Sequence, residues 1–196
     1  MSSQESLDDI QEDILCNLIC PLKDNATKLV FGKGDEQANI FFIGEAPGEK
    51  EDLEGLPFVG RAGQELDKLL QTINLSINDV YIANILKYRP PKNRNPNAQE
   101  MQTHTPYLVR QIRVINPKII VPLGNFATKF VLNNFIVKGM NKLPGISLLH
   151  GQKKEITINN KSFTVVPMYH PAAMLYNPKL KETMKEDFQK IKEVIS

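Results

Sequence analysis

The sequence is poor in the features that mark secreted and membrane-bound proteins. Its only cysteines, Cys16 and Cys20, are too few for a disulfide scaffold, so we interpret them as reduced thiols or as ligands. No apolar run approaches the roughly 20 residues of a membrane span, and the acidic start MSSQESLDDIQEDIL is unlike a signal peptide. Together these absences predict a cytoplasmic protein that does not use a membrane.

An excess of one charge is also missing. The 24 lysines and arginines nearly balance the 22 acidic residues, which leaves a net charge of +2 at pH 7. Binding to nucleic acid would therefore require basic residues that cluster locally. The phosphate-binding patterns GxGxxG and GxxxxGKS/T are absent as well, which counts against a nucleotide-binding α/β enzyme.

What is present predicts a single α/β domain over residues 1–196, with a helical segment at residues 1–20. Nearly continuous apolar runs predict four buried strands, at Asn39–Ile43, Val80–Leu86, Lys118–Leu123 and Phe163–Met168. Stripes of apolar residues at helical spacing lie between and after them. This alternation predicts a three-layer α/β/α fold around a four-stranded, mainly parallel sheet.

Unusual residues gather where the predicted strands end. The turn GEAPG (residues 44–48) follows the first strand, Asn84 lies near the end of the second, and PLGNFA and PMYHPAAML follow the third and fourth. The proline-rich loop YRPPKNRNPNAQ (residues 88–99) follows Asn84. Because ligands of open parallel sheets bind beyond the carboxyl ends of the strands, we expect these segments to share one rim.

At these residues the chain resembles family 4 of the bacterial and archaeal uracil-DNA glycosylases. The resemblance runs in order from about Cys20 to the C-terminus and is carried by FFIGEAPGEKEDLEGLPFVGRAGQELDKLL, YIANILKYRPPKNRNP, PKIIVPLGNFA and YHPAAML. GEAPG alone would be weak evidence, but its combination with PFVGRAG, RPPKNR and the late HP pair is specific. The resemblance implies the uracil-glycosylase fold and a monomer that removes uracil from single- or double-stranded DNA.

Cleaving an N-glycosidic bond requires stacking, recognition, and stabilisation of both a uracil anion and a sugar cation, after the base has left the helix. Phe58 is the candidate stacking plate, with a core phenylalanine as the competing interpretation. Asn84 is the candidate reader, because a carboxamide both donates to and accepts from the uracil edge; it could instead satisfy a strand end. His170 is the candidate donor to the uracil anion, and a structural histidine before proline is the alternative.

Glu45 is the candidate that places the water and stabilises the sugar cation, because the resemblance puts Ala46 where other uracil glycosylases carry an aspartate. The expected wall of the base pocket adds Gly44, Pro47, Gly48 and Glu51. Glu51 or Asp52 is an alternative contact to the base edge or a block against the 5-methyl group of thymine. Hydrophobic fit alone discriminates one methyl group by only about 1–3 kcal/mol, so a steric stop is required, and the sequence does not identify it.

Four basic residues in and beside the proline-rich loop are the candidate phosphate contacts, with a solvated loop as the alternative: Lys87, Arg89, Lys92 and Arg94. Met174 and Leu175 are candidates to wedge into the gap left by the flipped nucleotide, as apolar side chains do elsewhere. The resemblance favours Met174, and a core position is the alternative for both.

The sequence departs from family 4 at its iron–sulfur cluster. The family's 4Fe–4S cluster is held by four cysteines, and Cys16, Cys20, Tyr88 and His104 stand at those positions here. Because clusters are normally held by cysteine thiolates, a tyrosine and a histidine predict that no cluster or other cofactor binds. A retained cluster, or a zinc site on Cys16, Cys20 and His104, is a minor alternative.

A non-catalytic DNA-binding module on the same fold remains a second hypothesis for function, since fold does not fix function. The complete set Glu45, Phe58, Asn84 and His170 argues for the enzyme, because a binding module has no need to keep it. Covalent capture of the sugar would need a histidine in residues 88–99, which contain none, or an obvious Schiff-base lysine. The sequence therefore favours simple hydrolysis.

Overall fold

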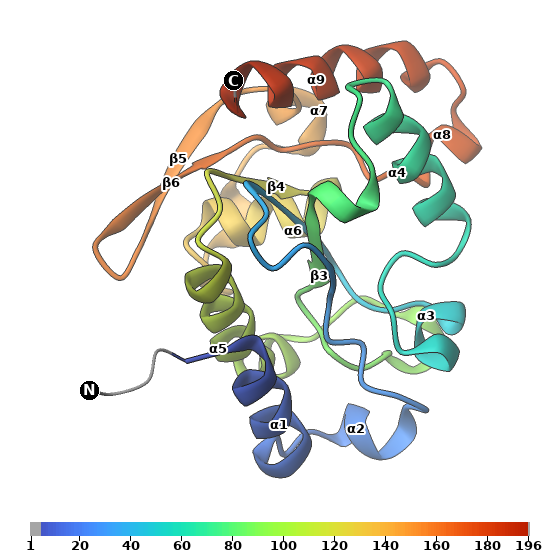
Figure 1. The fold of residues 1–196 in the computed structure, drawn as a ribbon. Helices are drawn as coiled ribbons and strands as arrows, with labels where there is room; N and C mark the ends of the chain where they lie inside the picture. Colours follow the sequence, from blue (N-terminus) through green and yellow to red (C-terminus); the bar gives the residue numbers. More distant parts are fainter. Residues whose placement is uncertain (1–4, 196) are drawn as a thin grey trace.

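A six-stranded sheet forms the centre of the computed structural model, which describes residues 5–195 (Figure 1). The strand order is β1-β3-β2-β4-β6-β5. The four inner strands are parallel: β3 (Tyr81–Asn84), β2 (Ile40–Gly44), β4 (Ile119–Pro122) and β6 (Lys161–Val165). They correspond to the four strands expected from the apolar runs, so the prediction of a parallel α/β sheet is confirmed.

The expected number of strands was wrong, because two antiparallel edge strands complete the sheet. β1 (Lys33–Gly34) pairs with β3, and β5 (Lys154–Ile158) pairs with β6. Strand β5 reaches β6 through Asn159 and Asn160, whose φ angles of 48° and 65° form a tight hairpin turn. In the sequence, this hairpin is indicated by alternating polar and apolar residues in β5 and by the two consecutive asparagines that follow it.

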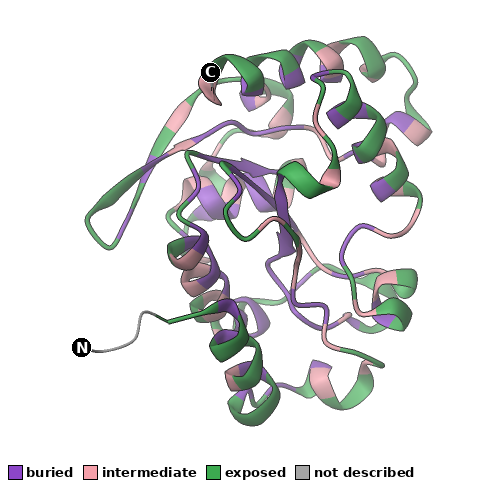
Figure 2. Ribbon diagram, in the orientation of Figure 1, coloured by how far each residue is buried: buried purple, intermediate pink, exposed green. Residues whose placement is uncertain are grey.

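Helices cover both faces of the sheet, as a three-layer fold requires. One face packs against α1 (Leu7–Asn17), α5 (Ala98–Ile115) and α6 (Gly124–Leu132). The other face packs against α4 (Arg61–Gln71) and α9 (Leu180–Ile195), and Figure 1 shows these two groups on opposite sides of the strands. Figure 2 shows the strands buried between helices that expose their outer surfaces.

Alternate residues of β2 show how a parallel strand serves two cores. Phe41 and Ile43 belong to the core beneath α1, α5 and α6, whereas Ile40 and Phe42 belong to the core beneath α4 and α9. All four side chains are at most 1% exposed. This double burial explains why the strand reads as a continuous apolar run.

The predicted N-terminal helical segment is observed as α1, and residues 1–4 of that segment lie outside the described residues. Ser6 caps α1 in a reciprocal capping box with Asp9. Four short helices complete the fold: α2 (Pro21–Asn25), α3 (Glu49–Glu54), α7 (Ile146–Leu149) and α8 (Ala173–Tyr176). No helix within residues 5–195 has the length and apolar character to cross a bilayer.

The carboxyl ends of the inner strands form one continuous rim. The pairing of β2 with β3 continues past the strands, because the amides of Ile85 and Leu86 donate to the carbonyls of Gly44 and Glu45. On the other side, a single parallel bridge between Leu123 and Met168 continues the pairing of β4 and β6. The segments after β2, β3 and β6 are therefore held beside one another.

Candidate active site

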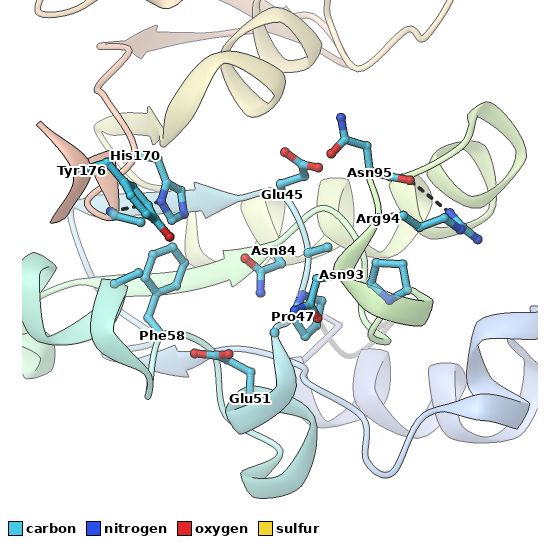
Figure 3. Close-up of a pocket in the computed structure, with 15 residues that line it drawn as sticks. Glu45, Pro47, Glu51, Phe58, Asn84, Asn93, Arg94, Asn95, His170 and Tyr176 are labelled. Carbon is cyan, nitrogen blue, oxygen red and sulfur yellow. Dashed lines mark hydrogen bonds between the residues drawn. The ribbon is translucent and has the colours of Figure 1, made fainter. Parts of the chain in front are cut away.

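A cleft of about 720 Å³ opens at this rim (Figure 3). It is lined by Glu45 after β2, Phe58 between α3 and α4, Asn84 at the end of β3, and His170 after β6. Four side chains from distant parts of the sequence thus face one space. Glu45, Asn84 and His170 lie in segments that the rim argument named, whereas the PLGNFA segment after β4 does not line the cleft. The volume lies within the roughly 300–1,000 Å³ that is typical of small-molecule pockets.

Gly44 allows two of these side chains to meet. A Cβ atom at Gly44 would lie 2.2 Å from Oδ1 of Asn84 and 2.8 Å from Cε2 of Phe58. Both distances are shorter than van der Waals contact, so any other residue at position 44 would push the asparagine or the phenylalanine aside. Gly44 itself does not line the cleft. Its role is to leave space that the side chains of Asn84 and Phe58 occupy.

Phe58 is held in an unusual backbone conformation. Its φ angle of 52° is uncommon for a residue with a side chain, and such a conformation persists only where its surroundings enforce it. The ammonium of Lys33 donates to the carbonyl of Phe58 at 3.1 Å. A Cβ atom at Gly63 would lie 1.9 Å from the same carbonyl oxygen, so α4 can approach Phe58 only through a glycine.

Glu51 fixes the chain that follows Phe58. Its Oε1 accepts hydrogen bonds from the amides of Val59 and Gly60, both at 3.0 Å. The ring of Phe58 consequently faces His170, with ring centroids 5.7 Å apart and planes inclined by 32°. Glu51 lines the cleft, but these bonds give it a role in positioning the aromatic wall. Asp52, the other acid considered, instead accepts bonds from the amides of Thr27 and Lys28.

The carboxamide of Asn84 is available to a ligand. Asn84 is only 2% exposed, yet no hydrogen bond among the described residues uses its side chain. Its amide atoms are not among the buried polar atoms that lack a partner, so they face the open cleft. Asn84 is thus set to pair with a group that enters the cleft and offers one donor and one acceptor.

His170 is arranged to act as a neutral donor. Its Nδ1 accepts a hydrogen bond from the amide of Ala172 at 3.2 Å, so the neutral ring carries its proton on Nε2. Burial lowers the pKa of His170, and the charge of Glu51 opposes this to a smaller extent. The imidazole is therefore uncharged at neutral pH and keeps an N–H to offer.

Glu45 supplies the cleft with an acid whose proton affinity is increased. Burial raises the pKa of this carboxyl group above its ordinary value. Figure 3 shows Glu45 in the middle of the cleft, close to Asn84. Ala46, Pro47 and Gly48 continue the wall from Glu45, as expected from the GEAPG turn. The cleft thus combines an aromatic face, an amide, a neutral donor and an acid.

Comparison with known proteins agrees with this arrangement. Residues 31–194 match the model of the uracil DNA glycosylase superfamily. The chain belongs to the uracil-DNA glycosylase superfamily. It is 46% identical over 190 residues to the type-4 uracil-DNA glycosylase of Archaeoglobus fulgidus, covering 97% of this chain and 94% of that protein. It is 43% identical to the type-4 enzymes of Sulfurisphaera tokodaii (97% and 85% covered) and Saccharolobus solfataricus (98% and 88% covered).

The expectation that Lys87 contacts DNA phosphates was wrong. This lysine is fully buried, and its ammonium donates to the carbonyls of Phe31 and Asn84 and to Oε1 of Gln111. Burial lowers the pKa of Lys87 to about 7. The residue directly follows a buried strand in the sequence, and only the tertiary structure shows that its side chain turns inward. Lys87 supports the backbone of Asn84 from within the protein.

The other three basic residues lie in the proline-rich loop, but two of them are paired within the protein. Arg94 lines the cleft and binds both carboxylate oxygens of Glu100, at 2.9 and 2.5 Å. Arg89 donates to Oδ1 of Asn93 at 2.8 Å. Lys92 is exposed at the tip of the loop. Glu100 therefore offsets the charge of Arg94, whereas Arg89 and Lys92 keep theirs.

Met174 does not have the exposure that a wedge requires. Its side chain is 8% exposed and packs into the core beneath α4 and α9, which contradicts the expected insertion into DNA. Leu175 is half-buried and does not line the cleft. The neighbouring Tyr176, which the sequence reasoning passed over, lines the cleft and is 87% exposed. Its position at the end of an HP-containing segment gave no signal that distinguished it from Leu175.

Other cleft residues were also missed. Pro90, Asn93 and Asn95 line the cleft from the proline-rich loop, where the basic residues alone had drawn attention. Ala62 and Ala172 contribute small apolar surfaces. Lys33 had no sequence signal, because its role depends on β1 lying close to the Phe58 loop.

Three of the four residues at the expected cluster positions, Cys20, Tyr88 and His104, are packed together. The amide of Lys87 donates to Nδ1 of His104 at 2.9 Å, and Nε2 of His104 lies 3.3 Å from Sγ of Cys20. Tyr88 meets the His104 ring edge-on, with centroids 6.2 Å apart. Cys16 is exposed on α1. Burial lowers the pKa of His104 to about 4 and raises the pKa of the Cys20 thiol, so a neutral imidazole donates to a thiol.

The Gly44 contact predicts the effect of adding one methyl group. Gly44→Ala should displace Asn84 and Phe58 and lower uracil excision by about 100-fold, which is the scale of loss for a misplacement of about 1 Å. Gly145→Ala is the matched control, because its added carbon would lie 3.5 Å from the nearest atom. Single-turnover excision rates and melting temperatures of both variants test this. An active Gly44→Ala enzyme would contradict the proposed packing.

The buried Lys87 predicts a dependence of stability on pH. Because the pKa of Lys87 is about 7 in the folded chain against 10.5 for an ordinary lysine, the unfolded chain holds an extra proton between these values. The free energy of unfolding should then rise with pH across this window, by at most about 1.4 kcal/mol per pH unit. Urea unfolding at several pH values should show this rise in the wild type and a flatter curve for Lys87→Met. Parallel curves would contradict it.

Proposed function

We propose that this protein removes uracil from DNA by hydrolysing the N-glycosidic bond of a nucleotide flipped into the cleft. The observation that carries the proposal is the meeting of Glu45, Phe58, Asn84 and His170 in one space. The three relatives named above, which are type-4 uracil-DNA glycosylases at 43–46% identity, support it. The product would be an abasic site, which later steps in the repair of deaminated cytosine would process.

Recognition in this proposal depends on Phe58 and Asn84. The flipped base stacks on the ring of Phe58, which suits any base and supplies affinity. The carboxamide of Asn84 pairs with O4 and N3–H of uracil. Cytosine presents the opposite pattern on that edge, and the unpaired buried groups would cost about 1–3 kcal/mol. Cytosine is thus excluded because the Asn84 carboxamide, which makes no hydrogen bond among the described residues, can pair only with the uracil edge.

Bond cleavage in this proposal depends on His170 and Glu45. As the bond between C1′ and N1 breaks, its electron pair moves onto the uracil ring, and the Nε2–H of His170 donates to the developing charge at O2. The carboxylate of Glu45 faces the cationic sugar and holds the attacking water. The water oxygen bonds to C1′ and its proton passes to Glu45, because burial raises the pKa of this carboxyl group and makes its carboxylate a stronger base.

Simple hydrolysis is the form of the reaction we propose. The proline-rich loop contains no histidine to capture the sugar. Lys33 lies near Phe58, but its ammonium is bound to the Phe58 carbonyl. The cleft is completed by residues of one chain, and we propose a cytoplasmic monomer. The non-catalytic DNA-binding module is not favoured, because the relatives are named as glycosylases.

The activity is tested with oligonucleotides that contain uracil or thymine at one position, followed by alkaline cleavage of abasic sites. The wild type should yield strand scission with uracil alone. His170→Ala should lower the single-turnover rate about 100-fold, since loss of one such donor costs about 10²–10³ in rate, and Glu45→Gln should also be impaired. His150→Ala is the matched control, because this histidine lies outside the cleft. Binding without scission by the wild type would instead indicate the DNA-binding module.

We further propose that this protein functions without the iron–sulfur cluster of family 4. Four thiolates cannot be supplied by two cysteines. Both ring nitrogens of His104 are already used, by the amide of Lys87 and the thiol of Cys20. No group of three or more metal-binding side chains was found in the described part of the chain. The residues present therefore do not fit the cluster, and the Cys20–His104–Tyr88 packing takes its structural place.

This proposal predicts a colourless enzyme. Protein purified without oxygen, and protein treated with iron and sulfide, should both lack the visible absorbance and acid-labile sulfide of a cluster. Excision should be unchanged after treatment with a chelator. Cys16→Ser should match the wild type in activity and stability, because Cys16 is exposed. Stoichiometric iron and sulfide, or loss of activity on chelation, would overturn the proposal.

A further inference from the structure

Tyr176 is the one exposed large apolar side chain that reaches the cleft within residues 5–195. Seven large hydrophobic residues in this range are exposed, and Tyr176 alone among them lines the cleft. An aromatic ring that is 87% exposed to water beside a binding site is unusual, because burial of such a ring is normally a main source of stability. The ring is therefore available to a partner that enters the cleft.

Tyr176 is also fixed relative to His170. The amide of Ala173 donates to the carbonyl of His170 at 2.8 Å, and the turn continues as α8, which ends at Tyr176. Met174, in the same short helix, is anchored in the core. The helix thus presents Tyr176 outward at a set distance from the group that would contact uracil. Figure 3 shows Tyr176 beside His170, at the opposite end of the cleft from Arg94.

Several basic residues near the cleft already have partners within the protein, which makes an aromatic contact with DNA more important. Lys87 is buried, Arg94 is bound to Glu100, and Arg89 is bound to Asn93. Phosphate contacts from this loop are consequently weaker than its sequence suggests. Stacking of a base on an aromatic side chain contributes about 1–3 kcal/mol and does not depend on positive charge. The exposed ring of Tyr176 thus offers DNA a contact at the cleft that does not depend on the charge of this loop.

We propose that Tyr176 stacks on the nucleobases beside the flipped uracil and occupies the space that this base leaves in the duplex. The inference rests on the proposed excision of uracil, and it assigns to Tyr176 the wedge role expected of Met174. Filling the gap offsets part of the cost of unstacking, which a duplex imposes and a flexible single strand largely does not. The side chain should therefore matter most on double-stranded substrates.

The experiment compares Tyr176→Ala and Tyr176→Phe with the wild type on matched single- and double-stranded uracil oligonucleotides. Tyr176→Ala should weaken duplex binding and single-turnover excision by about tenfold or more, with a clearly smaller effect on the single strand. Tyr176→Phe should stay within about twofold of the wild type. Leu148→Ala is the control, because Leu148 is 68% exposed and does not line the cleft.

Each outcome separates the inference from the function on which it rests. Inhibition by free uracil should be the same for the wild type and Tyr176→Ala, because the base pocket stays intact. A wild type that excises uracil from no substrate would defeat the proposed function itself. An active wild type with an equally active Tyr176→Ala variant on duplex DNA would overturn the inference alone. Equal losses in Tyr176→Phe and Tyr176→Ala would also overturn it, by assigning the effect to the hydroxyl group.

Discussion

The close approach of Asn84 and Phe58 over Gly44 is the contact on which the rest of the site depends. Parallel pairing of β2 and β3 places Gly44 directly beside Asn84. Without a side chain at position 44, the asparagine and the aromatic ring occupy space that a Cβ atom would fill. The reader and the stacking plate of the proposed mechanism therefore come together because of one missing methyl group, at a point that the sheet itself determines.

Near this contact, several residues have a conformation or an ionisation that would be unfavourable without the neighbours that stabilise it. Phe58 has a positive φ angle, Lys87 is buried with a lowered pKa, and burial raises the pKa of Glu45. Each of these features costs stability on its own. Lys33, Glu51 and Gly63 enforce the first, and the carbonyls of Phe31 and Asn84 with Gln111 satisfy the second. Several destabilising features near one cleft are expected where residues have been selected for binding or chemistry at the expense of stability.

Several basic side chains that the sequence suggested for contacts with DNA instead form hydrogen bonds within the protein. The basic residues of the proline-rich loop brace the loop against α5 and against itself, and Lys87 joins β3 to α5. In the same region, His104 and the thiol of Cys20 pair beside Tyr88. Hydrogen bonds between β3 and α5 therefore support the backbone of Asn84, and the groups that make them are neutral or paired.

The sequence by itself determined the fold class, the four inner strands and the identity of the main cleft residues. Continuous apolar runs are typical of strands that are buried on both faces, and segments that follow parallel strands lie at one edge of the sheet. The tertiary structure alone decided the fate of Lys87, Met174, Tyr176 and Lys33. Whether a long side chain turns inward or outward depends on neighbours from other segments, which no local pattern encodes. The edge strand β1 escaped for a related reason, because a strand of two residues owes its form to the strand beside it. The four-strand prediction left out β5 although the sequence carries a signal of its hairpin.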